Sequence, residues 1–370
     1  MTTRRNFLKA GSASLAAGIV FCGCGVLHGA HAQQPARQKL PVTVNGKQVK
    51  TIDVHAHCYF RETVALLGEE GDRIRLSPVS GTAETFIDIG QRLAAMDAQA
   101  VDMEILSINP FWYGRERDLA AQIVKIQNEK LAELCASKPD RFAAFASLTL
   151  QAPDLAVQEL EIAVKKHGLK GAAIGSLVNG LDFSDPKFHP VWAKAEELGV
   201  PLFIHPQVYP RSVPELNKRL TGNGWLINTI GAPLETTIAL SHLIFEGTLD
   251  RFPGLKLIAA HGGGYLASYA DRSDHACMVG PKACDPEIRL KKAPSEYLRQ
   301  IYFDSLVFSP EAIRHLAAQV GAGQIVLGSD YPYPWQLNPV DHIFASTSLS
   351  DEEKAGILGR TAAKLFNFET

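Results

Sequence analysis

The stretch Lys50-Thr-Ile-Asp-Val-His-Ala-His-Cys58 is typical of a buried β-strand that carries two histidines near its end. Residues i and i+2 of a strand point to the same side, so the imidazoles of His55 and His57 leave one face no more than about 7 Å apart. Two neutral imidazoles that converge at a strand end supply half of a divalent metal site. The pattern predicts a metal centre and directs attention to the ends of later strands.

Apolar runs that resemble strands recur along the chain, and several follow Gly or Pro punctuation. With the first run, they cover residues 51–57, 101–108, 143–150, 169–176, 200–205, 255–261, 301–307 and 325–330. Helical patterns separate them at residues 85–98, 118–138, 154–167, 189–198, 234–251 and 310–319, and a last helix is expected at 350–366.

This alternation predicts an α/β fold, a (β/α)₈ TIM barrel with its active site at the C-terminal ends of the strands. An open doubly wound sheet is the alternative. It calls for a glycine-rich phosphate turn after the first strand, where this chain has His-Ala-His-Cys-Tyr-Phe60. We therefore favour the barrel.

The composition excludes several classes of partner. The 370 residues are 46% hydrophobic and 21% charged, with a net charge of −2. That is enough chain for one large barrel or two medium domains. Because there is neither a basic excess nor a charge run, we expect no nucleic acid partner and no anionic membrane surface.

Residues 1–32 look like a twin-arginine export signal. Thr3-Arg-Arg-Asn-Phe-Leu-Lys9 precedes an Ala/Gly-rich apolar stretch, and Ala30-His-Ala32 is a small-x-small cleavage pattern. The apolar stretch is too short and too weakly hydrophobic for a transmembrane anchor. We expect cleavage near Ala32 and a periplasmic mature chain outside the membrane, with a linker at 33–48 and the barrel at 49–370.

The mature chain keeps four cysteines, Cys58, Cys135, Cys277 and Cys284. The periplasm would permit a disulfide, and the last two are close in sequence. Four scattered cysteines in a large barrel do not form a disulfide framework, so we expect unpaired thiols.

Two later strands end in further metal-binding residue types. His205 closes Val200-Pro-Leu-Phe-Ile204, and Asp330 closes Gln324-Ile-Val-Leu-Gly-Ser329. Asp330 could instead cap a helix, but the Tyr-Pro-Tyr-Pro334 that follows cannot begin one promptly. We predict a metal site of three histidines and one aspartate: His55, His57, His205 and Asp330. Zn²⁺ is the first choice of ion, and Mn²⁺ is possible.

His261 opens His-Gly-Gly-Gly264 after the sixth strand, where glycines would let the backbone approach a ligand closely. A fourth imidazole ligand would close the site, so we interpret His261 as the general base or acid beside a metal-bound water. Arg272 would suit capture of a substrate carboxylate, although a solvated helix charge is the commoner fate of an arginine. Trp225 and Phe111-Trp-Tyr113 could line a flat pocket or pack the barrel mouth.

These residues and several longer strings resemble the amidohydrolase superfamily (amidohydrolase-related family 2), in the branch of aminocarboxymuconate-semialdehyde decarboxylase. The strings are Ile52-Asp-Val-His-Ala-His57, Arg92-Leu-Ala-Ala-Met-Asp-Ala-Gln-Ala-Val-Asp102, Pro233-Leu-Glu-Thr-Thr237, His261-Gly-Gly-Gly264, Pro294-Ser-Glu-Tyr297, Phe303-Asp-Ser305 and Leu327-Gly-Ser-Asp-Tyr-Pro332.

The resemblance implies roles for six residues. It places four of them at metal-ligand positions: His55, His57, His205 and Asp330. It places His261 at the position of the catalytic histidine that activates the metal-bound water. Arg272 falls where the decarboxylase has an arginine that reaches a neighbouring subunit's site to bind a carboxylate, which implies a homodimer.

Two departures bear on the substrate. The decarboxylase has a second substrate arginine shortly before its Met-Asp-Ala-Gln string, whereas residues 80–86 here contain none, and Arg73 and Arg75 lie earlier. The loop after His205, Pro-Gln-Val-Tyr-Pro210, also differs. The resemblance therefore does not carry over the muconate-semialdehyde substrate.

We predict a divalent-metal-dependent, non-oxidative decarboxylase of a hydroxylated aromatic or dienoate carboxylic acid. His261 and Asp330 are its expected catalytic residues, with His261 assisting proton transfer at the metal-bound water. The alternative is a metal-dependent hydrolase of a lactone, amide or C–C bond, or a hydratase, of the same superfamily. A periplasmic binding protein on a barrel scaffold is the non-enzymatic alternative.

Overall fold

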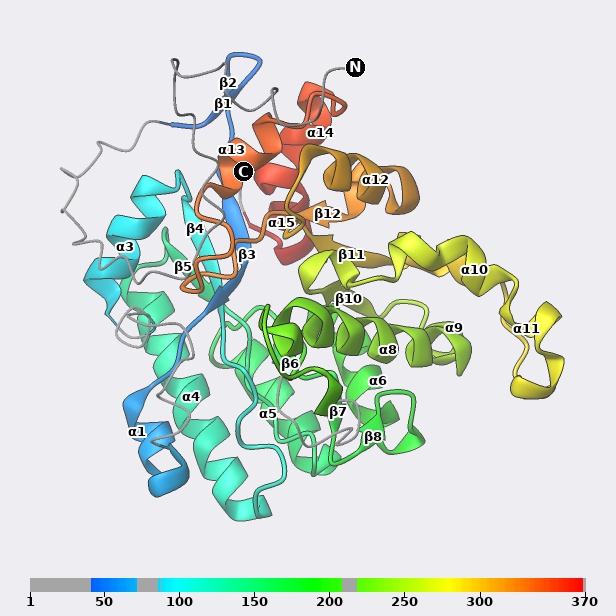
Figure 1. The fold of residues 1–370 in the computed structure, drawn as a ribbon. Coiled ribbons are helices and arrows are strands. Elements are labelled where there is room, and N and C mark those ends of the chain that lie inside the picture. The colour runs from blue at the N-terminus through cyan, green and yellow to red at the C-terminus, as the bar shows by residue number, and fades with distance from the viewer. Residues whose placement is uncertain (1–40, 72–85, 87, 208–217, 369–370) are drawn as a thin grey trace, which may run out of the picture. The chain divides into compact units, whose positions relative to one another are not determined.

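Parallel strands form the centre of the fold (Figure 1). The computed structural model describes residues 41–71, 86, 88–207 and 218–368. Within those ranges each predicted strand is present in a shorter form: β3 (Ile52–His57), β4 (Met103–Ser107), β5 (Phe142–Ala144), β6 (Ala172–Ile174), β9 (Pro201–Ile204), β10 (Lys256–Ala259), β11 (Ile301–Asp304) and β12 (Ile325–Val326).

These strands close on themselves into a barrel. One parallel group has the order β3-β4-β5, and the other has the order β12-β11-β10-β9-β6. Isolated parallel bridges join the two groups, Ala146 to Ala172 on one side and Ala56 to Tyr331 on the other. The prediction of a (β/α)₈ barrel is confirmed.

The barrel interior has an apolar floor directly below the histidine pair. Ile52, Val54, Phe203 and Phe366 belong to one buried cluster. The register between β3 and β4 shifts after Asp53, and beyond the shift the ring of His55 lies 5.0 Å from that of Phe203. The apolar cluster therefore ends at Phe203, where the ring of His55 begins the polar group.

The helices follow the predicted pattern with two interruptions. They are α3 (Ile89–Ala98), α4 (Arg117–Ser137), α5 (Pro153–Lys165), α6 (His189–Leu198), α8 (Ala232–Phe245), α9 (Thr248–Arg251), α12 (Pro310–Val320), α14 (Asp351–Ala355) and α15 (Thr361–Phe366). Gly247, with φ at 70°, separates α8 from α9, and a π-helical turn, Gly356–Arg360, separates α14 from α15. In the described part of the chain, no helix has both the length and the apolar character needed to cross a bilayer.

Several short elements were not predicted. Two hairpins, β1 (Thr43–Val44) with β2 (Lys47–Gln48) and β7 (Leu177–Val178) with β8 (Leu181–Asp182), turn at Asn-Gly pairs with positive φ. Asn-Gly between short strands is a strong hairpin signal, so the sequence contained the information. The first hairpin lies in the stretch assigned to a linker. Short helices also occur: α1 (Arg61–Ala65), α10 (Ala270–Asp274), α11 (Ala276–Val279) and α13 (Pro339–Phe344).

Cys277 and Cys284 form a disulfide, so the expectation of unpaired thiols was wrong for this pair. The chain turns back after α11 at Gly280-Pro281 and brings the two Cα atoms to 5.7 Å, within the range that a disulfide requires. Cys58 and Cys135 are free, as expected. Counting cysteines over the whole barrel overlooked this local turn.

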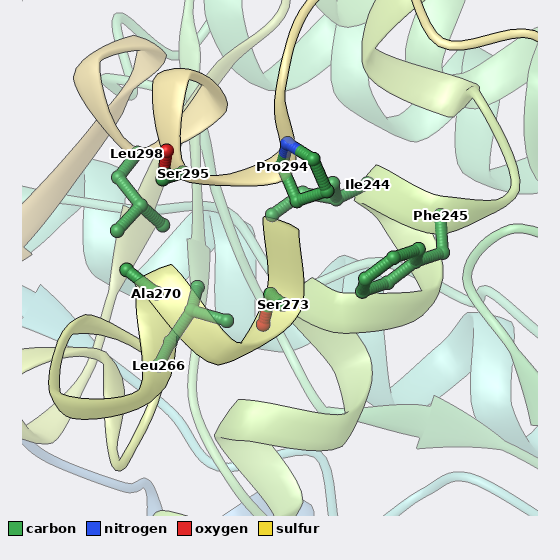
Figure 2. A pocket seen from close by; sticks show the side chains of 8 residues that line it. All are labelled: Ile244, Phe245, Leu266, Ala270, Ser273, Pro294, Ser295 and Leu298. Carbon is green, nitrogen blue, oxygen red and sulfur yellow. The ribbon is translucent and has the colours of Figure 1, made fainter. Parts of the chain in front are cut away.

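A small apolar pocket lies between α10, α8 and the 3₁₀ turn Pro294–Gln300 (Figure 2). Its lining is Ile244, Phe245, Leu266, Ala270, Ser273, Pro294, Ser295 and Leu298. None of these side chains ionises near neutral pH, and the hydroxyls of Ser273 and Ser295 are the polar groups of the lining. The pocket is therefore a packing feature beside α10 and no candidate for the active site.

Candidate metal centre

The polar residues predicted at the strand ends converge at one end of the barrel. One ligand atom each from His55, His205, His261 and Asp330 lies within 4.8 Å of the other three. His57 joins this group, because its Nε2 lies 3.0 Å from Nε2 of His55 and 2.9 Å from Oδ1 of Asp330. The structure thus places all five of these predicted site residues together.

Hydrogen bonds at Nδ1 orient His55 and His57, the two histidines of β3. Nδ1 of His55 donates to Oδ2 of Asp304 over 2.6 Å. Nδ1 of His57 lies 3.1 Å from Oγ of Ser107, and that hydroxyl donates in turn to the carbonyl of Ala56. A histidine whose Nδ1–H is engaged presents a lone pair on Nε2. Both Nε2 atoms of the pair therefore face the centre as acceptors.

Three electron-rich atoms meet at this point. Oδ1 of Asp330 lies 3.2 Å from Nε2 of His55 and 2.9 Å from Nε2 of His57. Such a contact requires a shared positive charge, which either a proton or a metal ion supplies.

The surroundings of His205 favour a metal ion over a shared proton. His205 is 7% exposed, and neither of its ring nitrogens has a hydrogen-bond partner among the described residues. Its ring centre lies 4.6 Å from that of His57 and 5.0 Å from that of His55. A proton shared by the pair would leave this buried imidazole unpaired at a cost of about 1–3 kcal/mol. A divalent ion would engage it, so the donor set fits a metal ion better.

Burial sets the protonation states of two of the imidazoles. It lowers the pKa of His57 to about 4 and holds the pKa of His205 well below its usual range. Both are therefore neutral near pH 7, which is the form that binds metal ions.

The charges of the carboxylates act in the opposite direction. Burial would raise the pKa of Asp330, but the charge of His55 and the hydrogen bonds of His261, His55 and His57 together hold that pKa well below the usual range. Burial lowers the pKa of His55, but the charge of Asp330 and the hydrogen bond to Asp304 raise it to about 10. The site therefore attracts positive charge at this point, as a divalent ion would provide.

Asp304, at the end of β11, is a site residue that the sequence analysis missed. It is fully buried, and its Oδ2 accepts from Nδ1 of His55 and, over 2.8 Å, from the backbone N–H of His261. Its Oδ1 accepts from the backbone N–H groups of Gly262 and Leu306. A metal-binding histidine usually donates its second ring N–H to a carboxylate. A search for an acidic strand-end residue to serve the histidine pair would have found Asp304.

Two site residues have backbone conformations that are uncommon outside glycine. The φ angles are 56° at His261 and 64° at Asp330. The glycines after His261 serve protein packing, because a Cβ at Gly263 would lie 2.5 Å from the Phe303 ring and one at Gly264 would lie 2.1 Å from the Pro233 carbonyl oxygen. Their expected role, close approach to a ligand, is replaced by close packing against β11 and α8.

Other predicted site residues lie elsewhere. Arg272 is exposed on α10 and is not among the side chains that meet at the metal centre. Trp112 is fully buried and its Nε1 donates to the Leu148 carbonyl, so it packs the barrel. Trp225 stacks on Trp335 with ring centres 5.6 Å apart. Arg73, Arg75, residues 80–85 and most of the loop after His205 lie outside the described residues.

An aromatic wall begins beside His57. The ring centre of Tyr333 lies 5.9 Å from that of His57 and 5.3 Å from that of Phe86, and Tyr59 lies 5.3 Å beyond Phe86. Aromatic side chains favour offset or edge contacts with other rings at such separations. The wall therefore lies next to the metal centre, with Phe86 buried between the half-buried rings of Tyr59 and Tyr333.

Comparisons with known proteins agree with this geometry. The chain is 31% identical over 283 residues to a 2-amino-3-carboxymuconate-6-semialdehyde decarboxylase of Dictyostelium discoideum, covering 75% of this chain and 76% of the relative. It is 30% identical over 298 residues to a gamma-resorcylate decarboxylase of a Rhizobium species, covering 75% of this chain and 86% of the relative.

A solved structure has the same fold. It is the 5-carboxyvanillate decarboxylase of Novosphingobium aromaticivorans, complexed with manganese and 4-hydroxy-3-methoxy-5-nitrobenzoic acid. It is 25% identical with a TM-score of 0.78, covering 86% of this chain and 96% of that one. The sequence profile of the amidohydrolase family matches residues 52–368. With a strand-end site of histidines and aspartate on a closed barrel, this chain belongs to the amidohydrolase family, in the branch that contains these decarboxylases.

Proposed function

We propose that this chain is a divalent-metal-dependent, non-oxidative decarboxylase of hydroxylated aromatic carboxylic acids. The observation that carries the proposal is the convergence of His55, His57 and Asp330 on one point, beside the imidazole of His205, which has no hydrogen-bond partner among the described residues. The aromatic wall that starts at Tyr333 supports a planar substrate. The similar proteins that act on γ-resorcylate and 5-carboxyvanillate support the substrate class.

The ion would be held by His55, His57, His205 and Asp330. When bound, it would act as a Lewis acid on the oxygens of the substrate carboxylate and of a neighbouring hydroxyl. We propose Zn²⁺ or Mn²⁺ as this ion. The three imidazoles suit Zn²⁺, and the manganese in the similar structure supports Mn²⁺.

His261 is the residue that we propose as the proton donor. Its side chain is 16% exposed, its Nε2 lies 3.6 Å from Oδ2 of Asp330, and its Nδ1 has no partner among the described residues. We propose that it delivers a proton to the ring carbon that bears the carboxylate. The C–C bond then breaks, its electron pair restores the aromatic ring, CO₂ leaves, and His261 regains a proton from water.

A decarboxylation assay with defined metal content tests the function. We expect purified residues 33–370 to release CO₂ from γ-resorcylate, from 5-carboxyvanillate or from a related hydroxybenzoate. We also expect chelation to lower the rate at least about 100-fold, and added Zn²⁺ or Mn²⁺ to restore it, because Lewis-acid stabilisation amounts to several kcal/mol. Acid formation from lactones or amides without CO₂ would favour the hydrolase alternative, and metal-independent turnover would contradict the proposal.

We propose that the chain is a homodimer in which Arg272 reaches the partner's site. Helices α10 and α11 lead away from the barrel strands (Figure 1), and Arg272 is exposed on α10. Beyond it, the segment closed by the Cys277–Cys284 disulfide carries Met278 and Val279, which are 69% and 78% exposed. Exposed apolar side chains of this kind favour burial against a partner.

Complementation tests the shared site. Mixed dimers of Arg272→Met and His261→Asn chains contain one intact site each if Arg272 acts in the neighbouring subunit. We expect re-associated 1:1 mixtures to reach about one quarter of wild-type CO₂ release, from the statistics of a twofold dimer. Mixtures that stay at the level of the separate variants, or a monomer in sedimentation equilibrium, would contradict the shared site.

We further propose twin-arginine export to the periplasm. Thr3-Arg-Arg-Asn-Phe-Leu-Lys9 and the cleavage pattern at Ala30-His-Ala32 support it. The Cys277–Cys284 disulfide is in keeping with an oxidising compartment. Cell fractionation tests the proposal, and recovery of the uncleaved chain from the cytoplasm would contradict it.

A further inference from the structure

Helix α3 directs one fully buried arginine toward the strand that carries the histidine pair. Nη1 of Arg92 donates to Oε2 of Glu104 over 2.7 Å, and Nη2 donates to the carbonyl oxygen of His57. The Arg92 guanidinium carbon also lies 4.8 Å from the centre of the Tyr331 ring. Arg92 therefore contacts His57 and the residue that follows Asp330.

These contacts span the seam at which the barrel closes. Among the described residues, β3 is joined to the segment that follows β12 through the isolated bridge of Ala56 with Tyr331, a few backbone hydrogen bonds and the hydrogen bonds that the Asp53 carboxylate accepts from Ser329. Two of the backbone bonds run from Asp330 N–H to the His55 carbonyl and from His57 N–H to the Tyr331 carbonyl, over 2.8 and 2.6 Å. The seam thus sets the distance between the histidine pair and Asp330.

Stability alone is a weak reason for this arrangement. Replacement of a buried ion pair by apolar side chains of similar volume is often neutral or stabilising. The planar guanidinium has instead the geometric property that positioning requires, because it presents N–H groups in a fixed fork to two acceptors at once. Here the acceptors are Glu104 on the neighbouring strand and the peptide of His57.

We propose that Arg92 is a positioning residue of the metal centre. It fixes the His57 peptide against Tyr331 and so holds the ligand atoms of His57 and Asp330 at the separation that a divalent ion requires. Its own contacts are with the His57 carbonyl, Glu104 and the Tyr331 ring. The inference rests on the metal centre of the proposed function. It adds the residue that sets the separation of two of the metal ligands.

The test compares Mn²⁺ binding by two variants of the mature chain. The double variant Arg92→Met, Glu104→Met removes the guanidinium and its carboxylate partner together, so no buried charge is left unpaired. Arg141→Met is the matched control. Arg141 lies beside the α3–β4 connection, and its hydrogen bonds go to Asp97 and to the carbonyls of Val101 and Asp102.

We expect the double variant to raise the Mn²⁺ dissociation constant about 10- to 100-fold, as the loss of residues that hydrogen-bond to metal ligands does. We also expect the EPR spectrum of bound Mn²⁺ to change. The control should bind Mn²⁺ within about twofold of wild type, whatever its effect on the thermal unfolding midpoint. Arg92→Lys keeps the charge but loses the fork, so we expect weaker binding from it too; it serves if the double variant does not fold.

Two outcomes would overturn the inference and can be told apart. If wild type, the double variant and Arg92→Lys bind Mn²⁺ equally tightly with the same EPR spectrum, Arg92 does not position the ligands, and the metal centre stands. If the wild-type chain binds neither Mn²⁺ nor Zn²⁺, the metal centre itself falls, and the role of Arg92 falls with it.

Discussion

The variant His261→Asn is expected to release CO₂ about 10²- to 10⁴-fold more slowly than wild type, which is the usual contribution of a positioned acid or base. Asparagine preserves a polar side chain but carries no proton that titrates. Exposure favours His261 for the proposed role, because its side chain is 16% exposed whereas those of His55 and His57 are 0% and 1% exposed. It is therefore the imidazole of this group that a substrate can best reach.

His261 could also be a metal ligand, because it lies within ligand distance of the predicted metal site. The same variant distinguishes proton transfer from metal binding. If His261 moves the proton, the Asn variant keeps its metal content and affinity while turnover falls. If His261 is a ligand, metal affinity falls as well. His315→Asn is the control: His315 lies on α12 beside Ser268, and we expect wild-type turnover from it. Full activity of His261→Asn would contradict both roles.

The sequence predicted those parts of the site that apolar strands deliver directly. Each of His55, His57, His205 and Asp330 stands at the end of an apolar run, and a parallel barrel brings all such ends to one face. The number and order of the eight strands followed from the same apolar runs. The fold of the barrel and the group of residues at its mouth were thus both readable from periodicity and from polar residues at strand ends.

The parts that could not be predicted depend on contacts across the fold. The position of Asp304 at a strand end marks it as a candidate partner for a histidine, but the histidine that it serves is identified only by its 2.6 Å contact with Nδ1 of His55, 249 residues away. Arg92 has the sequence context of a helix surface, and only the packing of α3 on β4 shows that it is buried against Glu104. The Cys277–Cys284 disulfide depends on a turn that a count of cysteines does not detect.

Asp304→Asn is expected to weaken metal binding about 10- to 100-fold, with a corresponding loss of turnover at limiting metal. The carboxylate accepts hydrogen bonds from Nδ1 of His55 and from the backbone N–H groups of His261, Gly262 and Leu306. Burial would raise the pKa of Asp304, but the hydrogen bond and charge of His55, the charge of His261 and the hydrogen bond of Gly262 together lower it, so the carboxylate remains ionised. A charged acceptor of this kind holds the His55 proton on Nδ1 and leaves Nε2 free for the ion.

An amide at position 304 cannot serve all these donors. If its oxygen faces His55, its NH₂ group meets the backbone N–H groups of Gly262 and Leu306 and leaves them unpaired. If its NH₂ group faces His55, the proton of His55 moves to Nε2, which points at Asp330 and the metal position. Ser107→Ala is the matched control: it removes the neutral hydroxyl partner of His57, and we expect a smaller loss of affinity from it than from Asp304→Asn. Chelator competition on both variants measures the difference, and equal, wild-type affinity in both would show that hydrogen bonds at Nδ1 do not orient the ligands.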